Sequence, residues 1–249
     1  MMRQISMLFK PAMVRALLKG RKTQTRRSFK FPDWTYGMDC TGQLVQYEHQ
    51  EGNEQHGLEF VTKGRTLWNK DSNPTGVSGA YLRVLFMPGD RIWVRENCWA
   101  EELMNGKDGV FYPADRSWHK IENTPAAADA WHMMLCYARK GDTSLTNIGK
   151  QVPCIHMPRW ASRLTLAVTD VRVQRLNEIS EADAIEEGIM KFGDGLFGYH
   201  EHAEIRFKTA KEAFKELWNN INCPDAWAAN PWVKVIKFDV IQGNIGEID

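Results

Sequence analysis

The segment that begins at residue 163 constrains the fold more than any other part of the sequence, because its apolar residues alternate in two phases. These residues are, in order, Leu164, Leu166, Val168, Val171 and Val173. The first three share one parity and the last two share the other. Strict alternation is typical of a half-buried strand, and a reversal of phase requires a bulge or bend. The sequence therefore predicts a long strand that bends near Thr169 and Asp170.

Several other segments carry the signals of regular structure. Residues 91–95 alternate behind the turn signal Gly89-Asp90 and predict a strand, and residues 232–240 predict a closing strand. A proline opens a short helix at 11–19, and Gly20 follows it where a left-handed cap is expected. Helices are also predicted after Ser180, ending at Gly188, and at 210–221 with Thr209 and Glu212 as the cap pair.

Two stretches lack such signals. Residues 31–80 are polar, rich in glycine and weakly periodic, which favours an insertion with at most short strands. Residues 101–131 have the composition of a loop, and 132–139 suit a strand or a helix equally. Bent strands with a few short helices between them predict an α+β domain around a small, mostly antiparallel barrel.

Composition narrows the class of protein. Hydrophobic residues make up 43% of 249 residues, as in an ordinary folded globule, and no apolar run approaches the ~18 residues of a membrane span. The five cysteines are scattered and form no C-x-x-C pair, and the N-terminus is a poor secretory signal. We therefore expect a cytoplasmic protein that has no contact with a membrane.

The charge is concentrated at the N-terminal end. Residues 1–32 hold nine Lys or Arg and no acidic residue, although the net charge of the whole chain is only +1. Within this end, residues 20–27 read Gly-Arg-Lys-Thr-Gln-Thr-Arg-Arg, and we call this stretch the basic segment. A basic segment attracts a phosphate backbone, a nucleotide or an acidic substrate. It is also what a solvated helix face or an organelle transit peptide contains. We expect residues 20–30 to face solvent and to line a concave site.

The order of these elements resembles a known family. The basic segment matches the G-R-K-T-x-T-x-R loop of the bacterial N4-acetylcytidine amidohydrolases, which are ASCH domains of the PUA-like superfamily. The short helix that contains Ala184-Ile185-Glu186-Glu187 is similar to the segment that supplies the acidic residue of that family. The resemblance covers residues 5–30, 84–100 and 160–240, and the whole chain looks like phage and prophage proteins that carry such a domain.

The resemblance implies a fold and an activity. It implies a single PUA-like domain over residues 1–249, with a mostly antiparallel β-barrel, peripheral helices, and insertions at about 31–80 and 101–155. It also implies an enzyme without cofactor that hydrolyses an N4-acyl amide of cytidine or a related base. The catalytic residues carried over are Lys22, Thr25 and Glu187, and Arg27 is a substrate or scaffold contact.

The chemistry of these residue types is compatible with hydrolysis. Neighbouring cations, Arg21 and Arg26 among them, disfavour the protonated form of Lys22, as a general base requires. The hydroxyl of Thr25 becomes a nucleophile, or positions a water, once a base takes its proton. Glu187 lies in the last turn of its helix, where the macrodipole disfavours a carboxylate unless a cation compensates. The basic segment is a candidate for that cation.

Other functions remain open at the level of sequence. Arg21, Lys22, Arg26 and Arg27 also suit a module that binds RNA, DNA or a modified base without catalysis, and Trp34 and Trp68 are the candidates for stacking on a base. A third possibility is a phage factor that binds a host protein through the insertions. No arrangement of His and Cys reproduces the ligand spacing of a metal site, so we predict no metal.

Overall fold

The computed structural model describes residues 3–29, 38–48, 54–62, 80–83, 86–136 and 151–247 of the chain. Their contacts divide the chain into two compact units. The first consists of Met1–Lys22, Gly89–Ala167 and Asp239–Asp249, and the second consists of Thr23–Pro88 and Val168–Phe238. Each unit is therefore assembled from segments that are distant in sequence.

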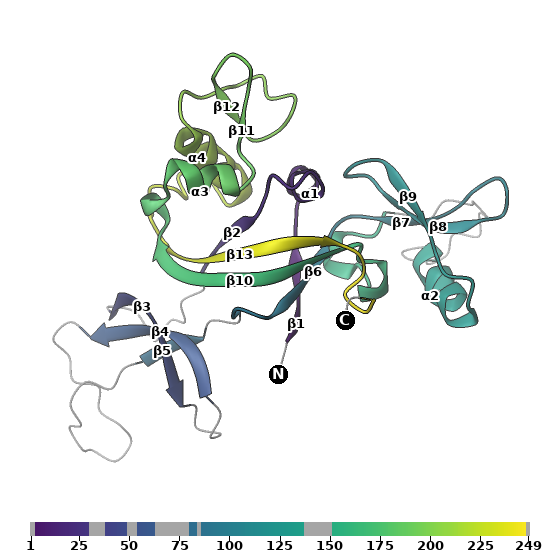
Figure 1. Ribbon diagram of the computed structural model, residues 1–249, viewed down its shortest axis with the longest axis horizontal. Coiled ribbons are helices and arrows are strands. Elements are labelled where there is room, and N and C mark those ends of the chain that lie inside the picture. The colour runs from purple at the N-terminus through teal and green to yellow at the C-terminus, as the bar shows by residue number, and fades with distance from the viewer. Residues whose placement is uncertain are drawn as a thin grey trace. The chain divides into compact units, whose positions relative to one another are not determined.

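The first unit combines a strand pair with a three-stranded sheet and its helix. Strand β1 (Gln4–Leu8) leads into helix α1 (Pro11–Leu18) and pairs in parallel with β6 (Arg91–Arg95). Strands β7 (Trp99–Glu102), β8 (Asp108–Tyr112) and β9 (Ser117–Lys120) form an antiparallel sheet. Helix α2 (Pro125–Leu135) lies beside that sheet (Figure 1) and buries Trp131 and Met134. The short turns Cys154–His156 and Arg159–Ala161 complete the unit.

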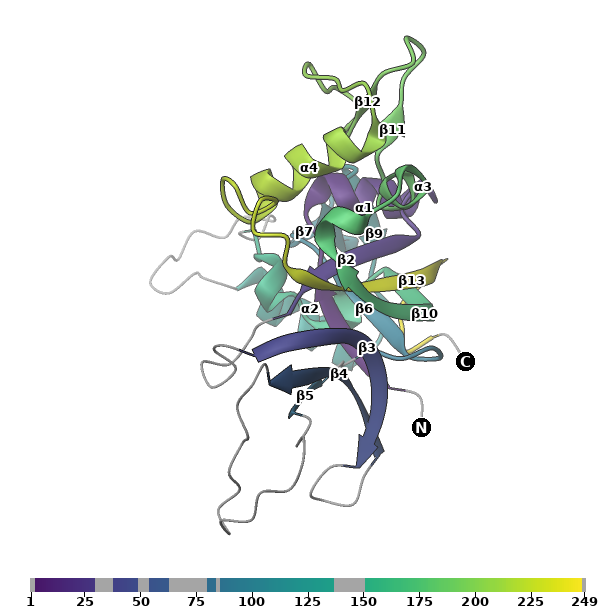
Figure 2. The same cartoon turned by 90° about the vertical axis from the view of Figure 1, so that its left-hand side faces the viewer.

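The second unit places two helices over one face of its strands. Strands β2 (Gln24–Ser28) and β13 (Trp232–Gln242) pair antiparallel, and the remaining helices are α3 (Glu181–Glu186) and α4 (Ala210–Ile221). Both helices lie on the same side of β13 (Figure 2), where Ala184, Phe214 and Val235 share one apolar core. The turn Leu176–Glu178 precedes α3, and the short strands β11 (Met190–Lys191) and β12 (Phe197–Gly198) follow α3. A separate sheet consists of β3 (Met38–Glu48), β4 (Glu54–Thr62) and β5 (Ala80–Arg83).

The strand order confirms a mixed α+β fold. The five strands of the largest sheet are hydrogen-bonded in the order β1-β6-β10-β13-β2, where β10 spans Leu164–Arg175. This order begins at β1 and ends at β2, so no closed barrel is found among the described residues. Strand β1 pairs in parallel with β6, so the chain reaches β6 through other elements instead of returning as a hairpin.

The reversal of phase predicted in the long strand is confirmed by its burial pattern. Leu164, Leu166 and Val168 are buried, Thr169 and Asp170 are exposed, and burial resumes at Val171. The helix caps are also as expected. Ser180 Oγ accepts a hydrogen bond from Asp183 N at 3.1 Å, and Thr209 and Glu212 cap α4 reciprocally.

The stretches expected to be loops contain regular structure instead. Residues 101–131 contain the end of β7, all of β8 and β9, and most of α2, which ends at Leu135. Strands β3 and β4 are 11 and 9 residues long, which is longer than the short strands expected within 31–80. In both cases the order comes from pairing with neighbouring strands, which local composition does not report.

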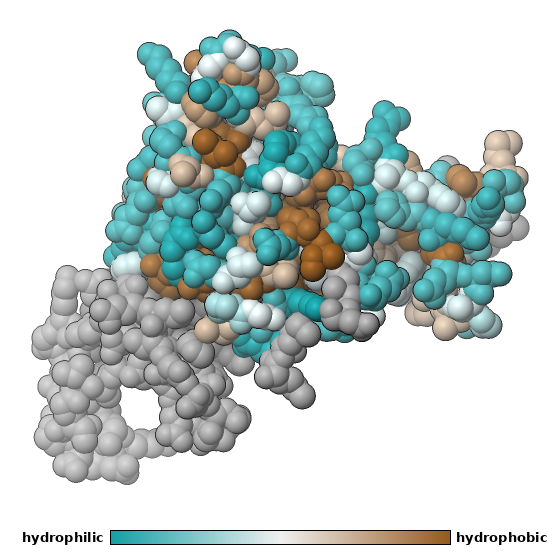
Figure 3. Space-filling view, viewed as in Figure 1, coloured by the Kyte–Doolittle hydropathy of each residue, from teal (hydrophilic) through white to brown (hydrophobic). Residues whose placement is uncertain are grey.

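The described surface is largely polar. Large hydrophobic side chains that are exposed lie far apart along the chain: Leu8, Met104, Met133, Ile155, Ile185 and Ile205. The face shown in Figure 3 carries hydrophobic residues in separate groups among hydrophilic ones. Within the part of the chain that the structure describes, no helix has both the length and the apolar character needed to cross a membrane.

Candidate functional site

The basic segment begins as the cap of α1. Gly20 adopts a φ of 65°, the left-handed conformation that glycine tolerates best, and Arg21 N and Lys22 N both donate to Ala16 O. Lys22 is fully buried, whereas Arg21 is half-buried. The expectation that residues 20–30 face solvent is therefore wrong for Lys22.

The second half of the basic segment is a strand and not a loop. Strand β2 pairs with the apolar strand β13, with Thr25 opposite Ile236 and Arg26 opposite Val235. Thr25 and Arg26 are both buried, which again corrects the expected solvent-facing loop. Paired residues share a face and successive residues alternate. Arg26 therefore lies on the face that α3 and α4 cover, and Thr25 lies on the opposite face.

Glu187 is the C-terminal cap residue of α3, and a cation meets it there. Arg26 Nη1 donates to Glu187 Oε1 at 3.0 Å, and both side chains are almost completely inaccessible to solvent. The carboxylate thus lies at the negative end of the helix dipole with a compensating guanidinium. This confirms that the basic segment supplies the cation expected beside Glu187.

A second carboxylate of α3 shares the same guanidinium. Arg26 Nη2 lies 3.1 Å from Asp183 Oδ2, and Arg172 Nη2 donates to Asp183 Oδ1 at 2.8 Å. Arg172 Nη2 also donates to Gln24 Oε1 at 3.2 Å. Burial by itself would raise the pKa of Asp183, but Arg26 and Arg172 outweigh it and hold the pKa below its ordinary value. The sequence predicts no role for Asp183 at the site.

The other predicted residues are placed as follows. Thr23 N donates to Glu186 O at 2.9 Å, so the backbone of the basic segment contacts the end of α3 next to Glu187. Thr25 and Glu187 belong to the second unit and Lys22 to the first. Desolvation lowers the pKa of Arg27, and the charge of Glu187 opposes that shift. Trp34 and Trp68, the proposed stacking residues, lie outside the described residues.

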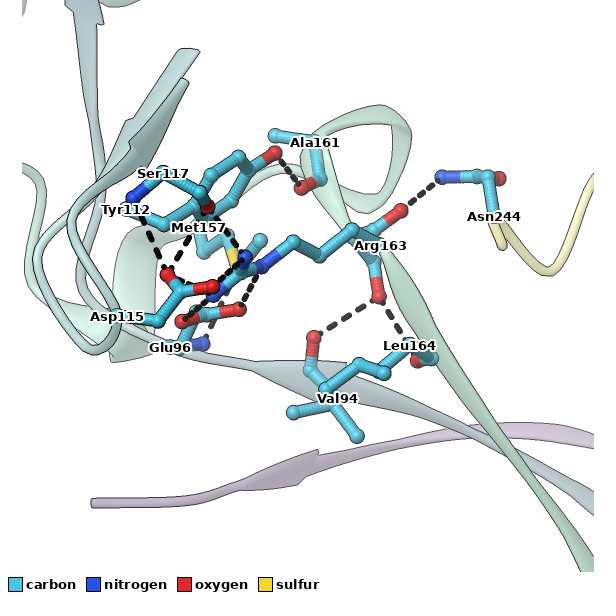
Figure 4. A network of polar contacts seen from close by, with 11 residues as sticks. Val94, Glu96, Tyr112, Asp115, Ser117, Met157, Ala161, Arg163, Leu164 and Asn244 are labelled. Carbon is cyan, nitrogen blue, oxygen red and sulfur yellow. Dashed lines mark hydrogen bonds and ion pairs between the residues drawn. The ribbon is translucent and has the colours of Figure 1, made fainter. Parts of the chain in front are cut away.

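A second polar network, in the first unit, has no counterpart in the sequence predictions. At its centre, Arg163 donates to both oxygens of Glu96 at 2.8 and 3.0 Å and to both oxygens of Asp115 at 2.9 and 3.0 Å (Figure 4). It also donates to Ser117 Oγ at 2.6 Å, and its guanidinium lies 4.1 Å from the centre of the Tyr112 ring. All five N–H donors of the guanidinium are thereby used.

This network borders a pocket. The pocket has a volume of about 800 Å³ and lies wholly within the first unit. Its buried floor includes Tyr112, Ala161 and Arg163, and alanines of α2 form one wall. None of the residues of the basic segment lines this pocket. A sequence signal for the network did exist, because Glu96 continues the core-facing parity of Ile92 and Val94, where a carboxylate requires a buried partner.

Comparisons with known proteins give no family assignment: no protein-family model, curated protein or solved structure matches the chain. Within the described residues, no group of three or more His, Cys, Asp or Glu is placed to hold a metal ion.

The lowered pKa of Asp183 predicts a specific dependence of stability on pH. A carboxyl whose pKa is depressed on folding stabilises the protein above its unfolded pKa, near 3.8, and loses this contribution as the pH falls through the folded pKa. At pH 6 we expect Asp183→Asn to lower the free energy of unfolding by about 1.5–3 kcal/mol, the value of charge-assisted hydrogen bonds.

Urea unfolding of wild type and Asp183→Asn at several pH values between 6 and 2 measures this effect. The difference between the two proteins should shrink steadily below pH 4, where the wild-type carboxylate takes up a proton. A difference that stays constant down to pH 2 would show that the charge of Asp183 does not stabilise the fold.

Proposed function

We propose that this protein acts on a modified nucleobase or nucleoside and hydrolyses an N4-acyl amide of cytidine or a related base. The observation that supports this proposal is the buried pair of Arg26 and Glu187, 3.0 Å apart. It joins the basic segment to the acidic end of the short helix, the two parts that the resemblance to N4-acetylcytidine amidohydrolases assigns to one site.

In this proposal each group has one chemical role. A base takes the proton of the Thr25 hydroxyl or of a water, and the resemblance assigns this role to Lys22. The activated oxygen attacks the acyl carbon, and the bond between that carbon and N4 breaks. The proton taken by the base returns to the departing amine, a transfer that the resemblance assigns to Glu187, and water then releases the acid if Thr25 was acylated. Because Glu187 lies with Arg26 on the face of β2 opposite Thr25, the proposal requires a water to carry this proton. Arg26 fixes the position of the Glu187 carboxyl group through its hydrogen bond, while Arg21 and Arg27 contact the substrate.

Burial of the cations favours a hydrolase over a reader of nucleic acid. A reader needs exposed cations that neutralise phosphates. Lys22 is fully buried, and Arg26 is buried with two carboxylates as partners. These side chains are therefore poorly placed to follow a polymer backbone.

Two assays on the full chain separate the functions. The first incubates the protein with N4-acetylcytidine and detects cytidine by chromatography, with Glu187→Gln as the inactive variant and Arg206→Met, at an exposed ion pair, as the matched control. The second measures binding of an RNA oligonucleotide as salt is raised. The proposal predicts cytidine from wild type and from Arg206→Met only. Absence of cytidine, together with RNA binding that falls steeply with salt, would replace the hydrolase with a reader.

A further inference from the structure

The pocket of the first unit is a candidate binding site separate from the proposed hydrolase residues. Its walls come from four parts of that unit: the end of α1, strands β8 and β9 with the chain next to them, helix α2, and the chain just before β10 together with the end of β13 and the residues after it. A volume of about 800 Å³ is in the range of sites for small organic molecules.

The pocket walls are held in place without a ligand. Asn244 Nδ2 donates to the carbonyls of Arg159, Trp160 and Ser162 at 2.9, 3.0 and 2.8 Å. Tyr112 donates its hydroxyl to Ala161 O at 2.7 Å. These bonds attach the C-terminal wall and the floor to the turn Arg159–Ala161. A preformed pocket binds with a smaller entropic cost than one that must be ordered.

The hydrogen-bond donors of Arg163 and Asn244 at the pocket are already used within the protein. Arg163 spends all five N–H groups on Glu96, Asp115 and Ser117, and the amide N–H groups of Asn244 go to backbone carbonyls. At the N-terminus of α2, Pro125 has no N–H, and Thr124 Oγ1 accepts from Ala127 N at 3.2 Å. The buried guanidinium of Arg163 is therefore not free to bind an anionic group such as phosphate.

Acceptor capacity remains. Oδ2 of Asp115 accepts one hydrogen bond among the described residues, from Arg163 Nη1, and a carboxylate oxygen can accept a second. Asp115 is exposed toward the pocket, and Glu122 and Glu247 add carboxylates to its lining. The lining contains two cations, Arg163 and Lys120. Glu96 and Asp115 neutralise the charge of Arg163, and Lys120 keeps its charge. The accessible charge of the lining is thus negative.

The apolar part of the lining suits a flat ligand. Alanines at 126, 127 and 130 form a smooth wall on α2, and Val110, Leu18 and Trp160 complete the apolar lining. We propose that this pocket binds a small planar ligand that carries a positively charged amine or amidine, with the charge directed to Asp115.

Benzamidine and benzoate test this proposal, because they share a ring and nearly the same size but carry opposite charges. Binding to the full chain is measured by titration calorimetry and by saturation-transfer NMR. We expect benzamidine to bind at least tenfold more tightly than benzoate. Equal affinity, a preference for benzoate, or binding of neither compound would overturn the proposal.

Variants of α2 locate the bound probe. Ala130→Trp fills the pocket and should weaken benzamidine binding at least tenfold, whereas Ala128→Trp, on the same helix but outside the lining, should change it less than twofold. If Ala130→Trp does not fold, Ala126→Trp, at an exposed lining position, gives the same comparison. If neither Ala130→Trp nor Ala126→Trp changes the affinity for benzamidine, the probe binds elsewhere and the proposal is contradicted.

Discussion

Replacing Arg163 by methionine is expected to lower the free energy of unfolding by about 3–5 kcal/mol. The change leaves Glu96 buried without the guanidinium that donates to both of its oxygens, and it also removes the partner of Asp115. An unpaired buried carboxylate destabilises the fold because it has lost its hydration and has no hydrogen bonds or opposite charge to replace it. Urea unfolding at pH 7 measures the loss.

The same substitution at an exposed pair is the matched control. Arg206→Met removes the partner of Asp194, both side chains being about 40% exposed, and should lower the free energy of unfolding far less than Arg163→Met does. Because burial already raises the pKa of Glu96, the unpaired carboxyl of Arg163→Met should take up a proton readily, and its stability should fall as the pH rises. Equal losses for the two arginine variants would show that the Arg163 network is not a buried ion cluster.

The pair of Arg26 and Glu187 gives the second large effect. Arg26→Met should cost about 3–5 kcal/mol, because two carboxylates of α3 lose their shared cation. Glu187→Gln should cost less, since its amide oxygen still accepts from Arg26. The double variant should be more stable than the sum of the two losses predicts, with a coupling of ~0.5–3 kcal/mol.

Lys237→Met provides the comparison for this cycle. Lys237 pairs with Glu186, the neighbour of Glu187, at 2.9 Å, but both side chains are more than one third exposed. Lys237→Met should therefore lower the free energy of unfolding by no more than ~1 kcal/mol. Additive losses for Arg26→Met and Glu187→Gln would mean that the two residues do not interact energetically.

Local signals in the sequence predicted the elements that local interactions decide. The phase reversal at Thr169 and Asp170, the caps at Ser180 and Thr209, and the cation beside Glu187 were all accessible from spacing and the helix dipole. Each depends on residues within one turn or one strand, or on a general preference for opposite charge.

Burial of the basic segment was not accessible in that way. Arg26 was expected in solvent because charged residues are rarely buried unless paired, and its partner Glu187 lies 161 residues away. Arg163 and Glu96 are likewise 67 residues apart. The floor of the pocket depends on the second of these pairs, because Arg163 lines the pocket and Glu96 holds its guanidinium. One sequence does not show which distant charges meet.

The rate of cytidine release from N4-acetylcytidine by Thr25→Val and Thr25→Ser tests the proposed site most directly. Valine keeps the shape of the buried Thr25 side chain and removes the hydroxyl, whereas serine keeps the hydroxyl. With both variants shown to be folded, we predict that Thr25→Val loses about 100-fold or more of the wild-type rate, and that Thr25→Ser retains most of it. A wild type that releases no cytidine, or a Thr25→Val variant as fast as wild type, would contradict the account.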